Sequence, residues 1–240
     1  MSPTTSSIII PKKVLLLLLG CISVLLLLHL LSYLNLIVND LDKEDFYFRK
    51  LDFGEEKNVP SIFSTLLYVV ISALLFKITF SILKIKKHLF FWLTLAIIFL
   101  FLGADELLRI HEKVGNAFSS NVETSGVFYY SWVIPYGIAV IVLGIALIKP
   151  LFNLPRATLL SFITAGTIFI AGAVGFEMIG GWYVDNYIED NSMMYLSRAV
   201  YILYTIEELL EMIGLSTFIY ALLRFRLKYV VPSIPKLSEI

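Results

Sequence analysis

Residues 89–112 read LFFWLTLAIIFLFLGADELLRIHE, an uncharged apolar run that ends in a dense group of ionisable side chains. A helix of about 20 residues crosses the roughly 30 Å hydrocarbon core of a bilayer, so this run is long enough to span a membrane. An ionisable side chain at membrane depth is costly and usually faces a bundle interior or a wet cavity. The stretch therefore predicts a spanning helix with a functional site near one end.

The rest of the chain is equally apolar. Of its 240 residues 58% are hydrophobic and 16% are charged, and the mean hydropathy is +0.85, values outside the range of ordinary soluble domains. Apolar runs of spanning length lie at about 12–38, 61–83, 89–112, 130–148, 157–180 and 196–223. We predict one all-α domain over residues 1–240, a polytopic transmembrane bundle of six helices.

Charged residues between the runs predict the orientation of the bundle. Basic residues gather at 12–13, 84–87, 149–156 and 224–228, whereas acidic residues gather at 39–60 and 185–190. Because short cytoplasmic loops retain lysine and arginine, both termini are expected in the cytoplasm and the acidic loop 39–60 outside. The net charge of zero reflects this balance, and no motif for nucleic-acid binding is present. The leucine run of 12–38 is typical of an uncleaved signal anchor.

The ionisable group at the end of run 89–112 was placed on an ideal helix at 100° per residue. Asp105, Arg109 and Glu112 then share one face, where the arginine can pair with either acid. Glu106 lies about 100° away, and His111 faces the side opposite Asp105. This geometry counts against a metal site formed by this helix alone.

A second acidic group lies in the last run. Glu207, Glu208 and Glu211 fall within about 100° of arc on a helix, and Tyr201 and Tyr204 project from nearly the same face. Like charges this close in a low dielectric cannot all remain ionised, so a raised pKa, a cation or a hydrogen-bond network must compensate.

A third acidic position, Glu177, lies about 30 Å along run 157–180 and therefore near the outer interface. By the same count residues 105–112 occupy the outer third of their helix and residues 207–211 reach the middle of theirs. We expect the three groups to line one cavity open to the outer face.

Carboxylates with an imidazole suit a divalent ion such as iron, manganese, zinc or magnesium. The expected ligands are Asp105, His111, Glu112, Glu177 and Glu207. The candidate catalytic acids and bases are Glu106, Glu208 and Glu211, with Arg109, Tyr201 and Tyr204 as further polar site residues. The chain contains no Glu-x-x-His, which disfavours a ferritin-like di-iron site, and its single cysteine excludes zinc sites built on several cysteines.

Three classes of function remain open. A membrane-embedded metal-dependent enzyme acting on a lipid or another amphiphile would hold a tight metal. A proton- or cation-coupled transporter would show ion-dependent uptake, because buried acids can carry protons or bind cations. An accessory subunit would copurify with a partner chain, and a homo-oligomer is compatible with each class.

Two smaller features carry expectations of their own. His29 is alone on an apolar surface and is expected to hydrogen-bond to a neighbouring helix. The cluster Phe46-Tyr47-Phe48 in the acidic loop predicts either a segment lying on the membrane interface or an aromatic anchor.

The stretch Leu102–Glu106 with His111-Glu112 forms an Asp-Glu-x4-His-Glu motif that resembles uncharacterised multi-pass membrane proteins of bacteria. In that group Asn-x-Pro, here Asn58-Val59-Pro60, precedes the second helix, and Glu-Glu-x-x-Glu, here residues 207–211, lies in the last. The resemblance implies a bacterial inner (plasma) membrane location, membrane lipids as neighbours and a shared importance of these acids. It implies no particular activity.

Overall fold

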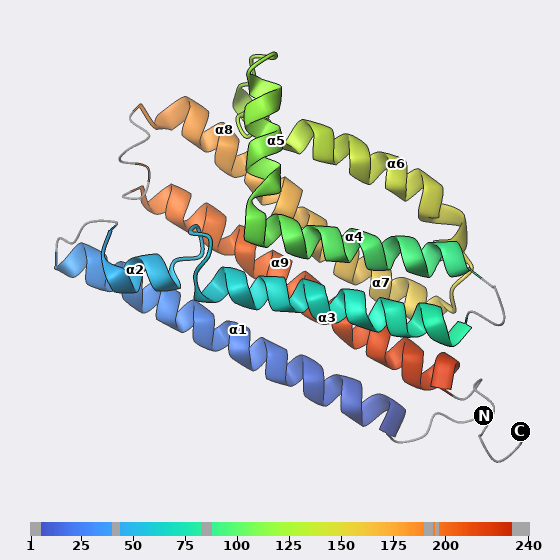
Figure 1. Ribbon diagram of the computed structural model, residues 1–240. Coiled ribbons are helices and arrows are strands. Elements are labelled where there is room, and N and C mark those ends of the chain that lie inside the picture. The colour runs from blue at the N-terminus through green and yellow to red at the C-terminus, as the bar shows by residue number, and fades with distance from the viewer. Residues whose placement is uncertain (1–5, 40–43, 83–87, 190–193, 195–196, 232–240) are drawn as a thin grey trace, which may run out of the picture.

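The structure, a computed structural model, describes residues 6–39, 44–82, 88–189, 194 and 197–231, and these residues form a bundle of long helices (Figure 1). The long helices are α1 (Ser6–Val38), α3 (Val59–Ile82), α4 (Leu89–Leu108), α6 (Val133–Phe152), α7 (Arg156–Ile170) and α9 (Arg198–Phe225). Shorter elements are α2 (Phe46–Leu51), α5 (Ile110–Ser119), the 3₁₀ turn η1 (Gly126–Phe128), the π-helical segments η2 (Ala171–Phe176) and η4 (Arg226–Val230), and α8 (Glu177–Tyr187). The predicted all-α class is confirmed, with no strand in these residues.

Helix α9 lies at the centre of the bundle, where it packs against α1, α3, α7 and η2. The core forms where Ile71, Leu75 and Ile78 of α3 meet Met212 and Leu222 of α9, all of them fully buried. These apolar side chains recur every three or four residues, which places them on one face of each helix. The carboxylates of α9 lie among buried apolar positions of the same helix, so its packing carries them into the bundle.

Five segments are long and apolar enough to cross a membrane, by length and composition: Ile9–Val38, Val59–Ile82, Leu89–Leu108, Val133–Phe152 and Arg156–Tyr187. Their outward faces carry large exposed aliphatic side chains, such as Leu16 at 69% and Ile145 at 71% exposure. Apolar surface of this extent is compatible with an integral membrane protein. Helix α9 is 28 residues long but carries three glutamates and is not among these five.

Several predicted boundaries are wrong. The predicted helix 89–112 is two helices, because α4 ends at Leu108 and α5 begins at Ile110. The predicted helix 130–148 begins at Val133 and extends to Phe152, and the predicted helix 157–180 continues through η2 to Tyr187. Residues 40–43 of the acidic loop and 84–87 of a basic cluster lie outside the described part of the chain.

Successive long helices run up and down, so α1 begins and α9 ends at the same end of the bundle, at the right in Figure 1. The opposite end carries α2, the end of α8 and the start of α9, and α5 stands across the bundle where α4 ends. Lys149 and Arg156 flank the α6–α7 connection at the first end, and Glu56 and Glu112 lie at the second. Glu56 and Glu112 therefore lie close together, and the acids of α4 and α9 line the same cavity.

Candidate functional site

The helix break at Arg109 shapes the site. Arg109 adopts the left-handed conformation, with φ 54° and ψ 49°, and its N–H donates to the Asp105 carbonyl at 2.7 Å. A non-glycine residue there is uncommon and costs about 1–2 kcal/mol. The Arg109 guanidinium forms ion pairs with Glu56 through Nε and with Glu112 through a terminal nitrogen at 2.9 Å. The chain therefore turns sharply away from α4 into α5 (Figure 1).

This turn brings His111 back onto Asp105. The His111 backbone N–H donates to Asp105 Oδ1 at 2.6 Å, and its Nδ1 lies 3.3 Å from Asp105 Oδ2. The prediction that His111 faces away from Asp105 is wrong, because it assumed a continuous helix through residue 109. A carboxylate bound to one ring nitrogen fixes the orientation of an imidazole and leaves the other nitrogen available.

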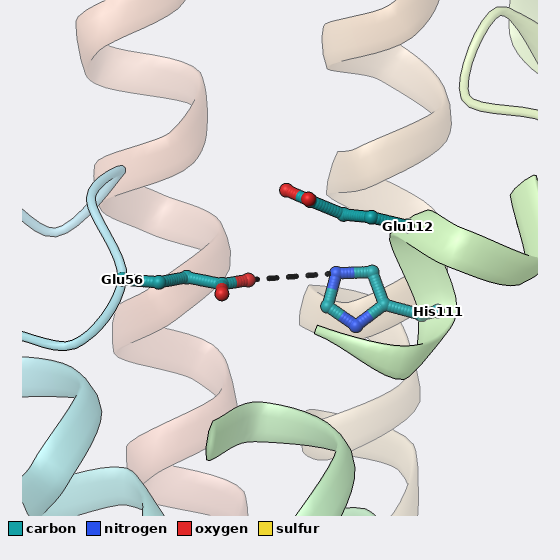
Figure 2. Close-up of side chains that lie close together, drawn as sticks. All are labelled: Glu56, His111 and Glu112. Carbon is teal, nitrogen blue, oxygen red and sulfur yellow. Dashed lines mark ion pairs between the residues drawn. The ribbon is translucent and has the colours of Figure 1, made fainter. Parts of the chain in front are cut away.

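The other nitrogen of His111 faces Glu56, which comes from the loop between α2 and α3. His111 Nε2 lies 3.7 Å from Glu56 Oε1, and Glu112 lies beside them on α5 (Figure 2). One ligand atom from each of these three residues lies within 4.8 Å of the other two. His111 and Glu112 were expected as ligands, whereas Glu56 was not among the predicted site residues.

A buried network holds that loop against the bundle. Asp52 Oδ1 lies 3.3 Å from His29 Nδ1 and accepts the Tyr204 hydroxyl at 2.8 Å, while Asn58 Nδ2 donates to the Asp52 carbonyl at 2.6 Å. His29 also hydrogen-bonds Thr205 of α9 at 2.9 Å, which confirms its expected contact with a neighbouring helix. Because these contacts join α1, α9 and the loop, they fix the backbone only a few residues before Glu56.

Tyr201 and Tyr204 contribute differently. Tyr204 holds Asp52 and lines the cavity described below. Tyr201 is buried and stacks against Tyr33 and His29, with ring centroids 3.6 and 4.6 Å apart, away from the cavity lining. Tyr201 thus supports the loop network rather than the polar site in which it was expected.

A cavity of about 1580 Å³ joins these groups. Its acidic lining residues are Asp52, Glu55, Glu56, Asp105, Glu106, Glu112, Glu123, Glu177, Asp185, Glu207, Glu208 and Glu211. The basic lining residues are Arg109 and His111. The acids of the three predicted groups therefore do share one cavity. Its strong excess of carboxylates over cationic side chains favours a positively charged ligand.

The deeper carboxylates have specific partners. Tyr68 of α3 donates to Glu211 at 3.1 Å, and the Trp132 indole donates to Glu177 at 2.9 Å. Gly172 allows η2 to approach α9, since a Cβ at this position would lie 2.7 Å from the Glu207 carbonyl. This close approach brings Glu177, which follows η2, to the α9 acids, and π-helical turns of this kind occur often at functional sites.

Burial changes proton affinity in the loop and in α5. Burial raises the pKa of Glu56, although the charges of Arg109 and His111 oppose the rise. Burial alone would lower the pKa of His111, but hydrogen bonding to Asp105 and the nearby acids outweigh it, so the pKa is raised. Burial raises the pKa of Asp52 to about 7, against the opposing hydrogen bond from Tyr204.

Four contributors were missed by sequence reasoning: Glu56, Asp52, Tyr68 and Trp132. The loop 39–60 contains many acids, and no local pattern distinguishes the three that line the cavity, Asp52, Glu55 and Glu56, from the others. Asp52 precedes Phe53, an apolar residue that packs in the core, but Phe48 is also apolar and buried, so neither phenylalanine identifies the acid beside it. Tyr68 resembles any other residue of its apolar run, and Trp132 was assigned to no site.

A family model described as "Domain of unknown function (DUF8692)" matches residues 15–225. The match includes every residue of the site. No curated protein and no solved structure showed significant similarity to the chain.

Proposed function

Since the chain belongs to the DUF8692 family, whose description leaves the function open, we propose a function from the site itself. The protein is a metal-dependent enzyme of the membrane that holds a divalent ion between Glu56, His111 and Glu112. Its substrate is a lipid or another amphiphile. The ion is iron, manganese, zinc or magnesium, because carboxylate oxygens with one imidazole suit these metals.

The distance between His111 and Glu56 carries the proposal. At 3.7 Å, Nε2 and Oε1 are too far apart for a hydrogen bond, yet they face one another. Two ligand atoms that each lie about 2.1 Å from one ion at a tetrahedral angle are about 3.4 Å apart. An ion between the two atoms therefore needs only a small adjustment of either side chain, and Glu112 supplies a third ligand.

Two neighbours of the ligands support the same assignment. Asp105 engages Nδ1 of His111, the arrangement by which proteins orient a metal-binding imidazole. Arg109 pairs with one oxygen of Glu56 and with Glu112, so its positive charge compensates these carboxylates in the structure. The other oxygen of Glu56 is the one directed at His111.

The deeper acids supply proton transfer. Glu106, Glu208 and Glu211 line the same cavity, and Glu211 is oriented by Tyr68. Carboxyl groups that line a site and are held in position act as general acids or bases. Glu177 and Glu207 lie on the same wall of the cavity and extend the set of possible ligands inward.

The proposed topology has six spans, with α9 as the sixth. The protein lies in a bacterial inner membrane, and both termini are on its cytoplasmic side. Helix α9 exceeds the length of a span, and its glutamates face the cavity instead of lipid. Lys149, Arg156 and Arg224 lie at the end of the bundle where α1 begins, and the preference for basic residues on the cytoplasmic side supports this orientation.

The metal content of detergent-purified protein tests the proposal. We expect stoichiometric metal by elemental mass spectrometry in the parent and in Glu189→Gln, an exposed acid outside the cavity. Glu56→Gln and His111→Gln should lose it. Glu106→Gln and Glu208→Gln test whether the site extends inward. Loss of the metal in both variants would mean that Glu106 and Glu208 belong to the metal site. A folded parent that stays metal-free after incubation with Mn²⁺ would overturn the proposal.

A second candidate is proton- or cation-coupled transport, favoured by the excess of acids over basic groups in the cavity. Buried acids that lack permanent partners can load and release cations. Uptake of protons or of a labelled cation into proteoliposomes, abolished by Glu208→Gln, would support transport. A metal-free parent with such uptake would favour this candidate over the enzyme.

A further inference from the structure

The cavity has an apolar arm besides its acidic end. Ile97 and Phe101 of α4 line one side of this arm, and Ala139, Val140 and Leu143 of α6 line the other. Ile97, Phe101 and Val140 are at the same time exposed at the molecular surface, by 54%, 45% and 43%. Residues that both line a cavity and reach the surface mark an opening, so the arm opens sideways between α4 and α6.

Helix α6 is separated from the bundle along this opening. It contacts α4 and α5 through few residues, and Val133 and Leu147 are its only buried positions among those described. A Cβ built on Gly137 or Gly144 would meet nothing within 4 Å. The aromatic pair Phe101 and Tyr136, with ring centroids 6.3 Å apart, bridges the two helices near the acidic end. Between this pair and Leu147, residues 137–146 of α6 are all half-buried or exposed.

The length of the cavity along α6, from its acidic end to the far end of the arm, matches one leaflet of a bilayer. Trp132 borders the acidic end, and Leu143 is the last residue of α6 in the lining. Eleven residues of helix correspond to about 16 Å, close to half of the roughly 30 Å hydrocarbon core. A hydrocarbon chain lying in the arm would thus keep its normal depth in the membrane.

We propose that the arm binds the acyl chain of a membrane lipid, which enters sideways between α4 and α6 and brings its head group to the acidic end. An apolar arm joined to a polar end matches an amphiphile, and the lateral opening spares the chain any passage through water. The chemistry at the head group rests on the proposed function. Binding of the acyl chain in the arm needs no metal.

The test uses purified protein in phosphatidylcholine nanodiscs that contain a small fraction of a phosphatidylcholine with a photoreactive diazirine in mid-chain. After irradiation, peptide mass spectrometry locates the labelled residues. In the parent we expect label on Ile97, Ala139 and Leu143. Ala139→Trp should lose most of this label because the indole fills the arm, and Ile138→Trp, on the exposed neighbour outside the lining, should keep it.

Label spread evenly over lipid-facing residues such as Ile141 and Ile145, or unchanged in Ala139→Trp, would overturn the proposal. Leu143→Trp provides a second filling variant, and thermal unfolding confirms that each variant folds. Mn²⁺ binding is measured on the same samples. Arm labelling in a protein that binds no Mn²⁺ would reject the metal site and retain the lipid arm. Mn²⁺ binding without arm labelling would retain the metal site and reject the lipid arm.

Discussion

Asp105 binds His111 twice, by accepting its backbone N–H at 2.6 Å and by placing its second carboxylate oxygen 3.3 Å from Nδ1. The first contact begins α5 after the break at Arg109, and the second turns the imidazole so that Nε2 faces Glu56. The Asp105 side chain thus fixes both the backbone position and the ring orientation of His111, the proposed metal ligand.

Asp105→Asn should weaken Mn²⁺ binding by about 10- to 100-fold. Its amide oxygen can still accept the backbone N–H, but the amide nitrogen would face Nδ1 and donate to it. The ring proton would then move to Nε2, the nitrogen that must bind the ion. Titration of detergent-purified protein with Mn²⁺, followed by electron paramagnetic resonance, measures the affinity. Equal affinities in parent and variant would exclude His111 Nε2 as a ligand.

Arg109→Gly should tighten Mn²⁺ binding, by up to about tenfold, because it removes a positive charge that competes for Glu56 and Glu112. The effect stays modest, since the arginine side chain is 41% exposed and partly screened. Glycine suits the left-handed backbone at this position. Calorimetric titration with Mn²⁺ tests the change.

Arg109→Ala is the matched control for the backbone. It removes the same charge but retains the strained conformation. Its free energy of unfolding should therefore be about 1 kcal/mol lower than that of Arg109→Gly, and it should unfold at a lower temperature. Weaker Mn²⁺ binding in both variants would mean that Arg109 positions the two carboxylates instead of competing for them.

Gly172→Ala should destabilise the fold by about 1–3 kcal/mol, since the new methyl group would lie 2.7 Å from the Glu207 carbonyl and force η2 away from α9. Gly166→Ala on the preceding helix is the control, because its Cβ would meet nothing within 4 Å. Thermal unfolding in detergent compares the two. If Gly172→Ala unfolds no earlier than Gly166→Ala, the close contact between η2 and α9 does not exist.

Asp52 should make stability pH-dependent. Burial raises the pKa of Asp52 from 3.8 to about 7 in the folded protein. The folded state therefore binds more protons than the unfolded state between these values, and the Asp52 contribution to stability is lost as pH rises from about 4 to 7. Asp52→Asn removes this contribution, so the stability of the variant relative to the parent should increase across the window.

Thermal unfolding of parent and Asp52→Asn at matched pH values measures this difference. The other titratable groups are present in both proteins, so the difference reports Asp52 together with its coupling to His29, whose Nδ1 lies 3.3 Å from Asp52 Oδ1. Glu189→Gln, on an exposed acid, should follow the parent at every pH. A constant difference between parent and Asp52→Asn from pH 4 to 7 would show that folding does not raise the pKa of the Asp52 carboxyl group.

The sequence alone predicted the helical class and five segments that match candidate spans, because a long apolar run has few alternatives to a helix in an apolar solvent. It also predicted which acids of α4, α5, α8 and α9 share a cavity, because helical rise fixes the depth of each residue. These properties depend on neighbours a few residues away along the chain.

The tertiary structure alone decided the geometry of the site. The cluster around His111 includes Glu56, which pairs with Arg109 although it lies more than fifty positions earlier in the chain. Glu56 in turn is held by contacts among Asp52, His29 and Tyr204, which come from three separate segments. Periodicity within one helix cannot encode such contacts, because their free energy exists only after distant segments have packed together.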